Sequence, residues 1–413
     1  MIADTSEMTC ITQDNESPGP TDAANTFWQQ AVKLEVDADF AITNPSFIGS
    51  NGRYVYFTDI GTNSIRVYDL NGRIRGLLYP GEQELFLGVQ PGDSAQHQLI
   101  TQFYNKGIAR LIYLAPYMPE GSEEVTFTLS APEITGDSAS SKYFNLPFLM
   151  TKDLRNKIAR YDSLNMRDNN IVISATHSRF FKPFSDALYG FPIQKGWPAV
   201  GIDLDTENLR SNPFYPGFYD TVPLLRVFTR SGNESQFDIG RISQPYIKHQ
   251  LGYFYVNPAY TFNEDHFYLV DKTSGELQVF RMQDILDRKN VFVTVQLFPK
   301  KISQLATSDP SGWTDKMAYM RSFQKGLFDC YIKDILATEQ YLYVLVMDNS
   351  HSEYVLRKYN RDATSLLDER HYSVNNIPAA KYAILRKDHQ KVELIGLEKD
   401  HGDYYLKTLI TDL

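Results

Sequence analysis

Short segments rich in β-branched and aromatic residues alternate with turn residues between Asn44 and Pro80. Four such segments follow one another, separated by Gly, Asn and Asp, as is typical of antiparallel strands joined by tight turns. Asn71 and Gly72 separate the last two segments, and this pair is a strong hairpin signal because both central residues of a type I′ turn need positive φ. The pattern predicts a four-stranded antiparallel meander.

The same unit recurs along the chain. Its second-strand pattern returns at 98–102, 170–175, 266–270, 341–345 and 391–395. Its third-strand pattern returns at 109–114, 224–229, 276–281, 354–359 and 404–409. Fourth strands are expected at 124–129, 236–239, 291–297 and 366–372. One such sheet cannot bury both of its faces, so the units must stack on one another, and the pattern predicts six sheets.

The two ends of this series complement each other. The last unit reaches Leu413 without a fourth strand, and the segment 29–36 alternates polar and apolar residues before the first unit. If 29–36 pairs with 404–409, the sheets form a closed ring without an open edge. The alternative, a linear array of β-sandwiches, leaves both ends unexplained.

The domain organisation follows from this ring. We expect residues 1–26, which are polar and lack apolar periodicity, to form a disordered tail, and 27–413 to form a single domain. Three connections are much longer than the rest, at 131–156, 177–222 and 299–328. Structureless loops of such length are usually functional or disordered. In a ring of four-stranded meanders all three would emerge on one face, which we call the top face.

The insert 177–222 carries many aromatic residues, among them Phe181, Tyr189 and Trp197. Rigid rings with a polar handle are typical of interfaces and of clefts that bind sugars or peptides. The alternative is a small satellite core that holds the insert on the ring. His177 and Arg179 lie at the root of the insert; His177 is the histidine best placed for acid–base chemistry, although such a residue more often forms a loop hydrogen bond.

The inner strands of the ring would contribute polar side chains to a central channel. The candidates are Arg160, Asp162, Tyr255, Lys333 and Lys381. Opposite charges across a channel can orient a ligand. More often, such groups satisfy one another and ordered water.

Composition limits the classes of function. The net charge is −9 and both signs are scattered along the chain, so the basic stripe of a nucleic-acid-binding protein is missing. No Gly-x-Ser-x-Gly, His-Glu-x-x-His or Gly-rich phosphate loop occurs. The two cysteines, Cys10 and Cys330, lie in the tail and in an expected strand, and they form neither a zinc pattern nor a predicted disulfide. We therefore expect no catalytic residue, metal or cofactor.

Aspartates follow three of the second strands, as Asp271, Asp348 and Asp400. Aspartate caps turns by accepting hydrogen bonds from nearby backbone amides. The alternative is a ring of oxygen ligands for a cation at the top face.

Six segments resemble the bacterial TolB-like six-bladed β-propeller families, many of them predicted lipoproteins of unknown function. These segments are Asn44–Gly49, Tyr54–Asp59, Ile65–Gly72, Gly252–Pro258, His266–Asp271 and Leu277–Phe280. The resemblance covers about residues 27–413 and implies an all-β, six-bladed β-propeller with four-stranded antiparallel blades. It also implies a place in the cell envelope, periplasm or cell surface, if a leader has been removed, and otherwise the cytoplasm. Propeller lactonases of the gluconolactonase type share the blade number, but their metal ligands have no counterpart that we can place on this chain.

The sequence thus predicts a monomeric binding or scaffolding module that recognises a protein, a carbohydrate or peptide, or another small polar ligand at the top face. We expect neither nucleic acid nor a transmembrane segment. The alternative is a metal-assisted hydrolase or lactonase acting at the mouth of the channel.

Overall fold

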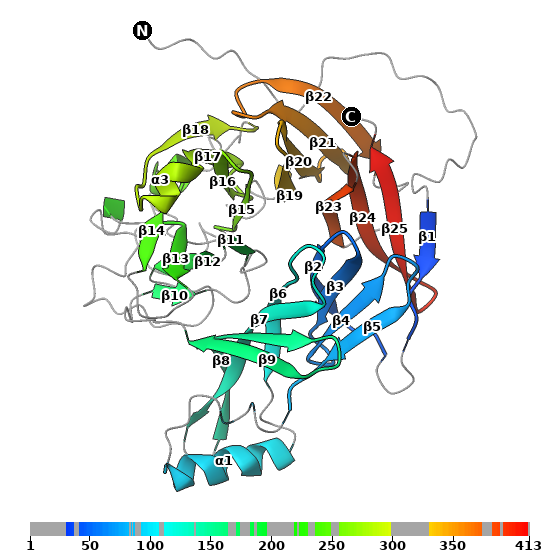
Figure 1. Ribbon diagram of the computed structural model, residues 1–413, viewed down its shortest axis with the longest axis vertical. Helices are drawn as coiled ribbons and strands as arrows, with labels where there is room; N and C mark the ends of the chain where they lie inside the picture. Colours follow the sequence, from blue (N-terminus) through cyan, green and yellow to red (C-terminus); the bar gives the residue numbers. More distant parts are fainter. Residues whose placement is uncertain are drawn as a thin grey trace.

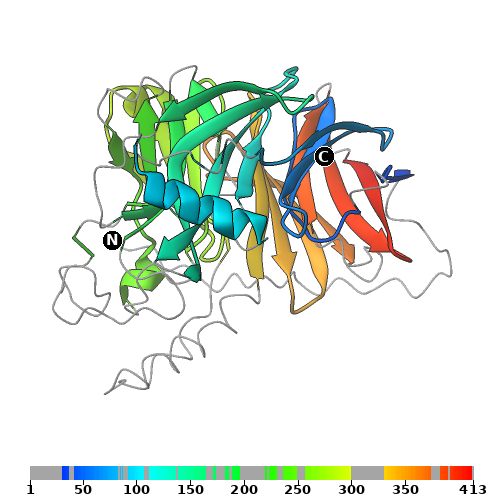
Figure 2. The ribbon, with the colours of Figure 1, turned by 90° about the horizontal axis from the view of Figure 1, so that it is seen from below.

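The computed structural model describes residues 30–36, 41–81, 84, 86, 92–106, 111–135, 138–163, 171–173, 182–185, 188–195, 219–220, 223–229, 236–248, 256–298, 330–373, 382–388 and 391–411. Their strands form six antiparallel sheets, five with four strands and one with five. Figure 1 shows these sheets around a common centre, in a propeller-like arrangement. Seen from the side, the strands of neighbouring sheets stand next to one another in a ring-shaped layer (Figure 2).

We number the sheets in chain order. Sheet 1 contains β2 (Pro45–Ser50), β3 (Tyr54–Asp59), β4 (Ser64–Asp69) and β5 (Ile74–Leu78). Sheet 2 contains β6 (Ile112–Tyr117), β7 (Glu124–Thr135), β8 (Ser138–Asp153) and β9 (Ile158–Ser163). Sheet 3 contains β10 (Ile171–Ile173), β11 (Lys182–Ser185), β12 (Leu188–Lys195), β13 (Leu225–Thr229) and β14 (Phe237–Ile239).

The remaining sheets follow the same plan. Sheet 4 contains β15 (Pro258–Phe262), β16 (His266–Asp271), β17 (Glu276–Arg281) and β18 (Phe292–Gln296). Sheet 5 contains β19 (Cys330–Ala337), β20 (Tyr341–Asp348), β21 (Glu353–Asn360) and β22 (Leu366–Ser373). Sheet 6 contains β23 (Tyr382–Asp388), β24 (Lys391–Asp400), β25 (Asp403–Thr411) and β1 (Gln30–Lys33). Three helices complete the described chain, namely α1 (Ser94–Asn105), α2 (Gln244–Lys248) and α3 (Met282–Leu286).

The closure predicted from the two ends of the chain is confirmed. β1 pairs antiparallel with β25, and Gln30 lies opposite Thr408 while Lys33 lies opposite Tyr405. The following residue, Leu34, is 2% exposed and packs in the core shared by sheets 6 and 1. The strand nearest the start of the chain therefore covers the outer edge of sheet 6.

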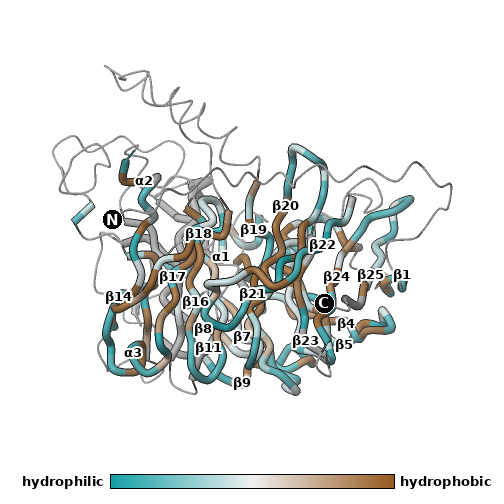
Figure 3. Tube along the Cα trace, turned by 90° about the horizontal axis from the view of Figure 1, so that it is seen from above, coloured by the Kyte–Doolittle hydropathy of each residue, from teal (hydrophilic) through white to brown (hydrophobic). Residues whose placement is uncertain are grey.

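The hydrophobic core lies between neighbouring sheets, as stacking requires. One buried cluster joins sheets 1 and 2, and others join sheets 4 and 5, sheets 5 and 6, and sheets 6 and 1. In Figure 3 the hydrophobic parts of the chain gather in the strands, and many turns are hydrophilic. The Cys330 side chain is buried in the cluster between sheets 4 and 5.

The expected strand at 98–102 is wrong, because these residues belong to α1. Ile100 and Phe103 are three residues apart and buried on one face of this helix. The Asp93 side chain accepts a hydrogen bond from the Gln96 amide at 3.0 Å and so caps the first turn. The helix lies at the outer rim of the ring (Figure 1).

Because 98–102 is helical, the strands of sheet 2 have earlier positions in their sheet than predicted. The segment 109–114, expected as a third strand, contains the start of β6, which is the first strand of its sheet. The segment 124–129, expected as a fourth strand, lies in β7, the second strand. The insert 131–156 is not a connection between sheets, because the long hairpin of β7 and β8 occupies most of it.

Sheet 3 departs from the expected blade. It has five strands in the order β10, β12, β13 and β14, with β11 paired to β12. Strands β11 and β12 lie within 177–222, so this insert is not wholly a loop as predicted. Five sheets, not six, have the predicted four-stranded form. The insert 299–328 and the tail 1–26 lie outside the described residues.

Candidate functional site: a groove between sheets 1 and 2

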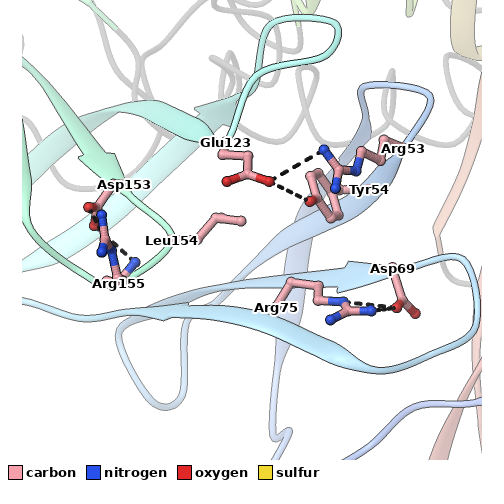
Figure 4. Close-up of a pocket in the computed structure, with 8 residues that line it drawn as sticks. All are labelled: Arg53, Tyr54, Asp69, Arg75, Glu123, Asp153, Leu154 and Arg155. Carbon is pink, nitrogen blue, oxygen red and sulfur yellow. Dashed lines mark hydrogen bonds and ion pairs between the residues drawn. The ribbon is translucent and has the colours of Figure 1, made fainter.

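A groove with a volume of ≈ 450 Å³ lies where four turns of sheets 1 and 2 meet. Its walls combine three arginines, three carboxylates, one tyrosine and one leucine (Figure 4). These residues are Arg53, Tyr54, Asp69, Arg75, Glu123, Asp153, Leu154 and Arg155. The groove therefore presents charges of both signs beside a small apolar surface.

Arg53 and Glu123 form one side of the groove. The Arg53 guanidinium lies 3.3 Å from Glu123 Oε1, and the two side chains are 62% and 61% exposed. The Tyr54 hydroxyl donates to the same Oε1 at 3.2 Å, and Arg53 also lies over the Tyr54 ring at 4.9 Å. Burial and the hydrogen bond to Glu123 raise the pKa of Tyr54. An exposed ion pair of this kind contributes little to stability and can open at little cost.

The β2–β3 and β6–β7 turns hold these residues at a fixed separation. Asn51 lies in the first turn, and its side-chain amide donates to Pro119 O at 3.0 Å and Ser122 O at 3.2 Å in the second. The Asn51 Oδ1 atom accepts the backbone amide of Tyr54 at 2.8 Å. One side chain thus closes its own turn and joins the two sheets.

Asp69 and Arg75 form the facing wall, at the turn between β4 and β5. Arg75 donates to Asp69 Oδ2 from Nε at 2.9 Å and from Nη2 at 2.6 Å, which is a two-pronged charged contact. The backbone amides of Asn71 and Arg73 donate to Asp69 Oδ1 at 2.9 and 3.0 Å. Burial alone would raise the pKa of Asp69, but the hydrogen bonds from Arg73, Arg75 and Asn71 lower it overall. This wall is preorganised by its own turn.

The turn between β8 and β9 supplies the third wall. Asp153 accepts the backbone amides of Arg155 and Lys157, both at 2.9 Å, and these bonds lower the pKa of Asp153. Leu154 packs against Gly76 of β5, where an added Cβ would lie 3.0 Å from Leu154 Cδ2 and 3.1 Å from its carbonyl oxygen. A glycine at position 76 therefore lets the turn of sheet 2 lie directly against sheet 1.

A buried charged cluster joins the same two sheets next to the groove. Lys152 Nζ lies 2.5 Å from Glu84 Oε1, and the two side chains are 1% and 3% exposed. The Tyr113 hydroxyl donates to Glu84 Oε2. Lys152 also donates to Tyr79 O at 2.9 Å and to Asn156 Oδ1 at 3.0 Å. Burial lowers the pKa of Lys152, while contact with Glu84 opposes that effect.

Four of the predicted site residues lie among the described residues. Lys333 lies on β19, the first strand of sheet 5, and is half-buried. Arg160 and Asp162 do not lie on an inner strand, because β9 is the outermost strand of sheet 2. Tyr189 lies on β12 in sheet 3. The structure does not bring these residues into the groove.

Six other predicted site residues lie outside the described residues. These are His177, Arg179, Phe181, Trp197, Tyr255 and Lys381.

Two of the three aspartates that follow second strands, Asp271 and Asp348, cap turns, as one of the two interpretations predicted. Asp271 accepts the amides of Asn257, Thr273 and Ser274 at 3.0 to 3.3 Å. Asp348 accepts the amide of Ser350 at 2.9 Å. Asp400 lies exposed at the end of β24 and opposite Asp403.

Asp59 has the same position in sheet 1. It accepts the amides of Thr43 and Asn44 at 2.9 and 2.8 Å. This aspartate therefore fastens the start of β2 to the far end of β3.

None of the groove residues was among the site residues predicted from the sequence. A signal was present, because Asp69 and Asp153 each end a third strand, and an arginine follows each of them within six residues. Equivalent turns of consecutive sheets lie at the same level of the ring. The recurrence of Asp and Arg at two such turns could have indicated a shared site.

Among the comparisons with known proteins, one solved structure supports the fold. No family model matches the chain, and no curated protein matches it. A solved structure of a DUF4221 family member from Bacteroides vulgatus is 9% identical, covers 94% of this chain and 98% of its own, and has a TM-score of 0.53. An exported protein from Bacteroides fragilis is 10% identical, with coverages of 95% and 98% and a TM-score of 0.46. A luciferin-regenerating enzyme is 9% identical, with coverages of 93% and 95% and a TM-score of 0.43.

The likeness to the DUF4221 family member supports the propeller-like part of the TolB-like resemblance but not membership of a TolB-like family. Among the described helices, none has the length and apolar character needed to cross a membrane.

Proposed function

We propose that this protein is a binding module whose groove between sheets 1 and 2 takes a charged peptide segment of a protein partner. The observation that carries the proposal is the exposed, easily opened pair of Arg53 and Glu123 beside the preorganised pair of Asp69 and Arg75. The first pair can exchange its internal contact for a ligand's carboxylate and ammonium groups. The Asp69–Arg75 pair keeps its geometry during this exchange, because backbone amides of its own turn already donate to Asp69.

The composition of the groove favours a ligand with both signs of charge. Arg155 is 80% exposed and offers a further guanidinium for a carboxylate. Glu123 offers an acceptor for an amine. The Tyr54 ring and Leu154 supply the apolar contact that a peptide side chain needs. A volume of ≈ 450 Å³ accommodates one or two residues of such a segment.

Three finer features belong to the same proposal. Sheet 3 acts as a sixth blade in spite of its extra strand. The aromatic insert 177–222 offers a separate contact area at the top face, as its ring content supports, whereas the groove lies on the other face because it is built from turns that join first to second and third to fourth strands. The protein works in the cell envelope, which rests on the TolB-like resemblance. In the alternative function, a metal-assisted hydrolase or lactonase, catalysis would need metal ligands at the channel mouth. Among the described residues, the one cluster of metal-binding side chains lies instead at the β20–β21 turn.

The groove is tested with an array of short peptides that alternate Asp or Glu with Lys. We expect the wild-type protein to select a subset of these peptides. The variants Arg53→Ala and Glu123→Gln should weaken binding to that subset by about tenfold each, since each removes one charged contact. Arg361→Ala is the matched control, because Arg361 forms another exposed ion pair, with Asp265, between turns of sheets 5 and 4, and the two side chains are 47% and 60% exposed. Selection that is unaffected by Arg53→Ala and Glu123→Gln would refute the groove as the site.

The insert is tested separately by Trp197→Ala. Deleting the whole insert would remove β12, the partner of β13, and would damage sheet 3 itself. If the single substitution leaves capture of the selected peptides and of their parent protein unchanged, the insert is not part of the recognition surface.

A further inference from the structure

The turn between β20 and β21 brings together two carboxylates and an imidazole. Asp348 and Glu353 are directly opposite residues at the end of this hairpin, and His351 lies in the turn between them. Like charges directly opposite each other on antiparallel strands are destabilising. Such a pair is relieved by a cation placed between the two carboxylates.

The geometry of the turn suits a metal ion. One potential ligand atom from each of Asp348, His351 and Glu353 can be chosen so that all lie within 4.8 Å of one another. His351 Nδ1 lies 2.9 Å from Asp348 Oδ2. Ligand atoms that are each about 2.1 Å from a tetrahedral zinc ion lie about 3.4 Å apart. Small rotations of these side chains would therefore reach a zinc-binding geometry.

The turn is shaped by its own hydrogen bonds. Ser350 donates to Asp348 Oδ1 from its amide at 2.9 Å and from its hydroxyl at 2.5 Å. These bonds leave Oδ2 of the buried Asp348 directed to His351. Ser352 has a φ of 53°, which reverses the chain so that Glu353 returns opposite Asp348.

A second layer of residues supports Glu353 from the neighbouring strand β22. His371 Nδ1 lies 2.8 Å from Glu353 Oε1, and His371 Nε2 lies 3.0 Å from Glu369 Oε1. Glu369 in turn accepts from Arg357 Nε at 2.5 Å. Outer residues that orient metal ligands in this way are characteristic of functional metal sites.

We propose that Asp348, His351 and Glu353 bind a zinc ion at the β20–β21 turn. An imidazole with two carboxylates suits zinc, whereas calcium and magnesium prefer sites built from oxygen atoms alone. His351 is 47% exposed, so the fourth position of the ion opens to solvent and can take water or a side chain of a partner. This site lies on sheet 5, away from the groove, and does not depend on the peptide-binding proposal.

The proposal is tested by titrating the metal-free full chain with zinc chloride in a calorimeter. We expect the wild-type chain to show a saturable event with one zinc ion per chain that disappears in His351→Ala and in Glu353→Gln. His371→Ala should weaken the same event by about 10–100-fold, since it removes an outer support but no ligand. Asp348 is left unchanged because it also caps the turn.

His401→Ala provides the matched control. His401 lies beside Asp400 at the corresponding turn of sheet 6 and is fully exposed, so its removal should leave the event unchanged. Cobalt(II) provides a second readout, since the intensity of its visible absorption reports tetrahedral coordination and should fall in His351→Ala. Melting curves without metal check that each variant is folded. If folded His351→Ala and Glu353→Gln bind zinc as the wild type does, the proposal is wrong.

Discussion

The buried contact between Lys152 and Glu84 should be one of the strongest links between sheets 1 and 2. Replacing Lys152 with Met removes a charge that is 1% exposed and leaves Glu84, itself 3% exposed, without its cationic partner. The same change leaves Tyr79 O and Asn156 Oδ1 without the donor at 2.9 and 3.0 Å. Breaking one side of a buried ion pair costs about 3–5 kcal/mol. We therefore expect Lys152→Met to lower the free energy of unfolding by about that amount.

A double-mutant cycle separates the loss of the pair from the loss of packing. Glu84→Gln keeps the shape of the side chain and an acceptor for the Tyr113 hydroxyl but removes the charge that faces Lys152. The double variant Lys152→Met, Glu84→Gln no longer contains a buried unpaired charge. Its cost should therefore be smaller than the sum of the two single costs by about 0.5–3 kcal/mol.

The assay is urea unfolding at pH 7, followed by circular dichroism and by tyrosine and tryptophan fluorescence. Arg155→Met is the control, because it removes a cation from the same β8–β9 turn whose side chain is 80% exposed, and it should cost less than about 1 kcal/mol. A cost for Lys152→Met as small as that of Arg155→Met would refute the reasoning. So would strict additivity in the cycle.

Three further predictions concern closure, acid stability and the groove. Leu34→Ala should lower the free energy of unfolding in urea by about 2–5 kcal/mol, because Leu34 is 2% exposed. Val36→Ala should lower it little, because Val36 is 43% exposed. Equal effects of the two substitutions would contradict a role of the segment that follows β1 in closing the ring. Hydrogen bonds outweigh the effect of burial and lower the pKa of Asp59 in the folded state. The Asp59 carboxylate therefore contributes to stability above its unfolded pKa of about 3.9, and this contribution is lost as the pH falls through the lower folded pKa. Asp59→Asn should therefore cost more stability at pH 7 than at pH 2, and a cost that does not change with pH would disprove this. Gly76→Val should push Leu154 into the groove and reduce peptide binding on the array, with unchanged binding as the contrary result.

Much of the fold could be predicted because local patterns and global closure agree. The Asn71-Gly72 pair correctly marks the turn between β4 and β5, and Gly72 has a positive φ of 77°. Asn71 is not among the residues with positive φ, so the turn is not the type I′ turn that the pair predicts. The clasp of β1 on β25 followed from counting strands at the two ends, which needs no knowledge of side-chain contacts.

The prediction failed where a short apolar run was ambiguous. The segment 98–102 alternates well enough for a strand, but its apolar residues also match the face of a helix, and periodicity alone cannot separate the two. The helix cap at Asp93 was the missed signal. Once the helix was counted as a strand, every later strand of sheet 2 was shifted, and Arg160 was expected inside the ring although it lies on the outermost strand.

The groove could not be predicted for a different reason. Its walls come from four turns that are far apart in the sequence, and they meet through contacts such as the hydrogen bonds of Asn51 to the β6–β7 turn and the close approach of Leu154 to Gly76. The proposed zinc site was anticipated only in part. Asp348 was singled out, but the position of Glu353 opposite it follows from the register of the hairpin, which the sequence alone does not determine.

The pairing of β1 with β25 also has a consequence for how the protein is made. Lys33 and Asp403 are separated by 370 positions, so the first of these strands leaves the ribosome long before the other exists. Until then β1 lacks β25, the strand with which it pairs. Closure of the ring therefore becomes the final step of folding, after the intervening sheets have formed. The entropy lost in closing so long a chain grows only with the logarithm of its length, and folded sheets between the two strands reduce it further by holding them close together.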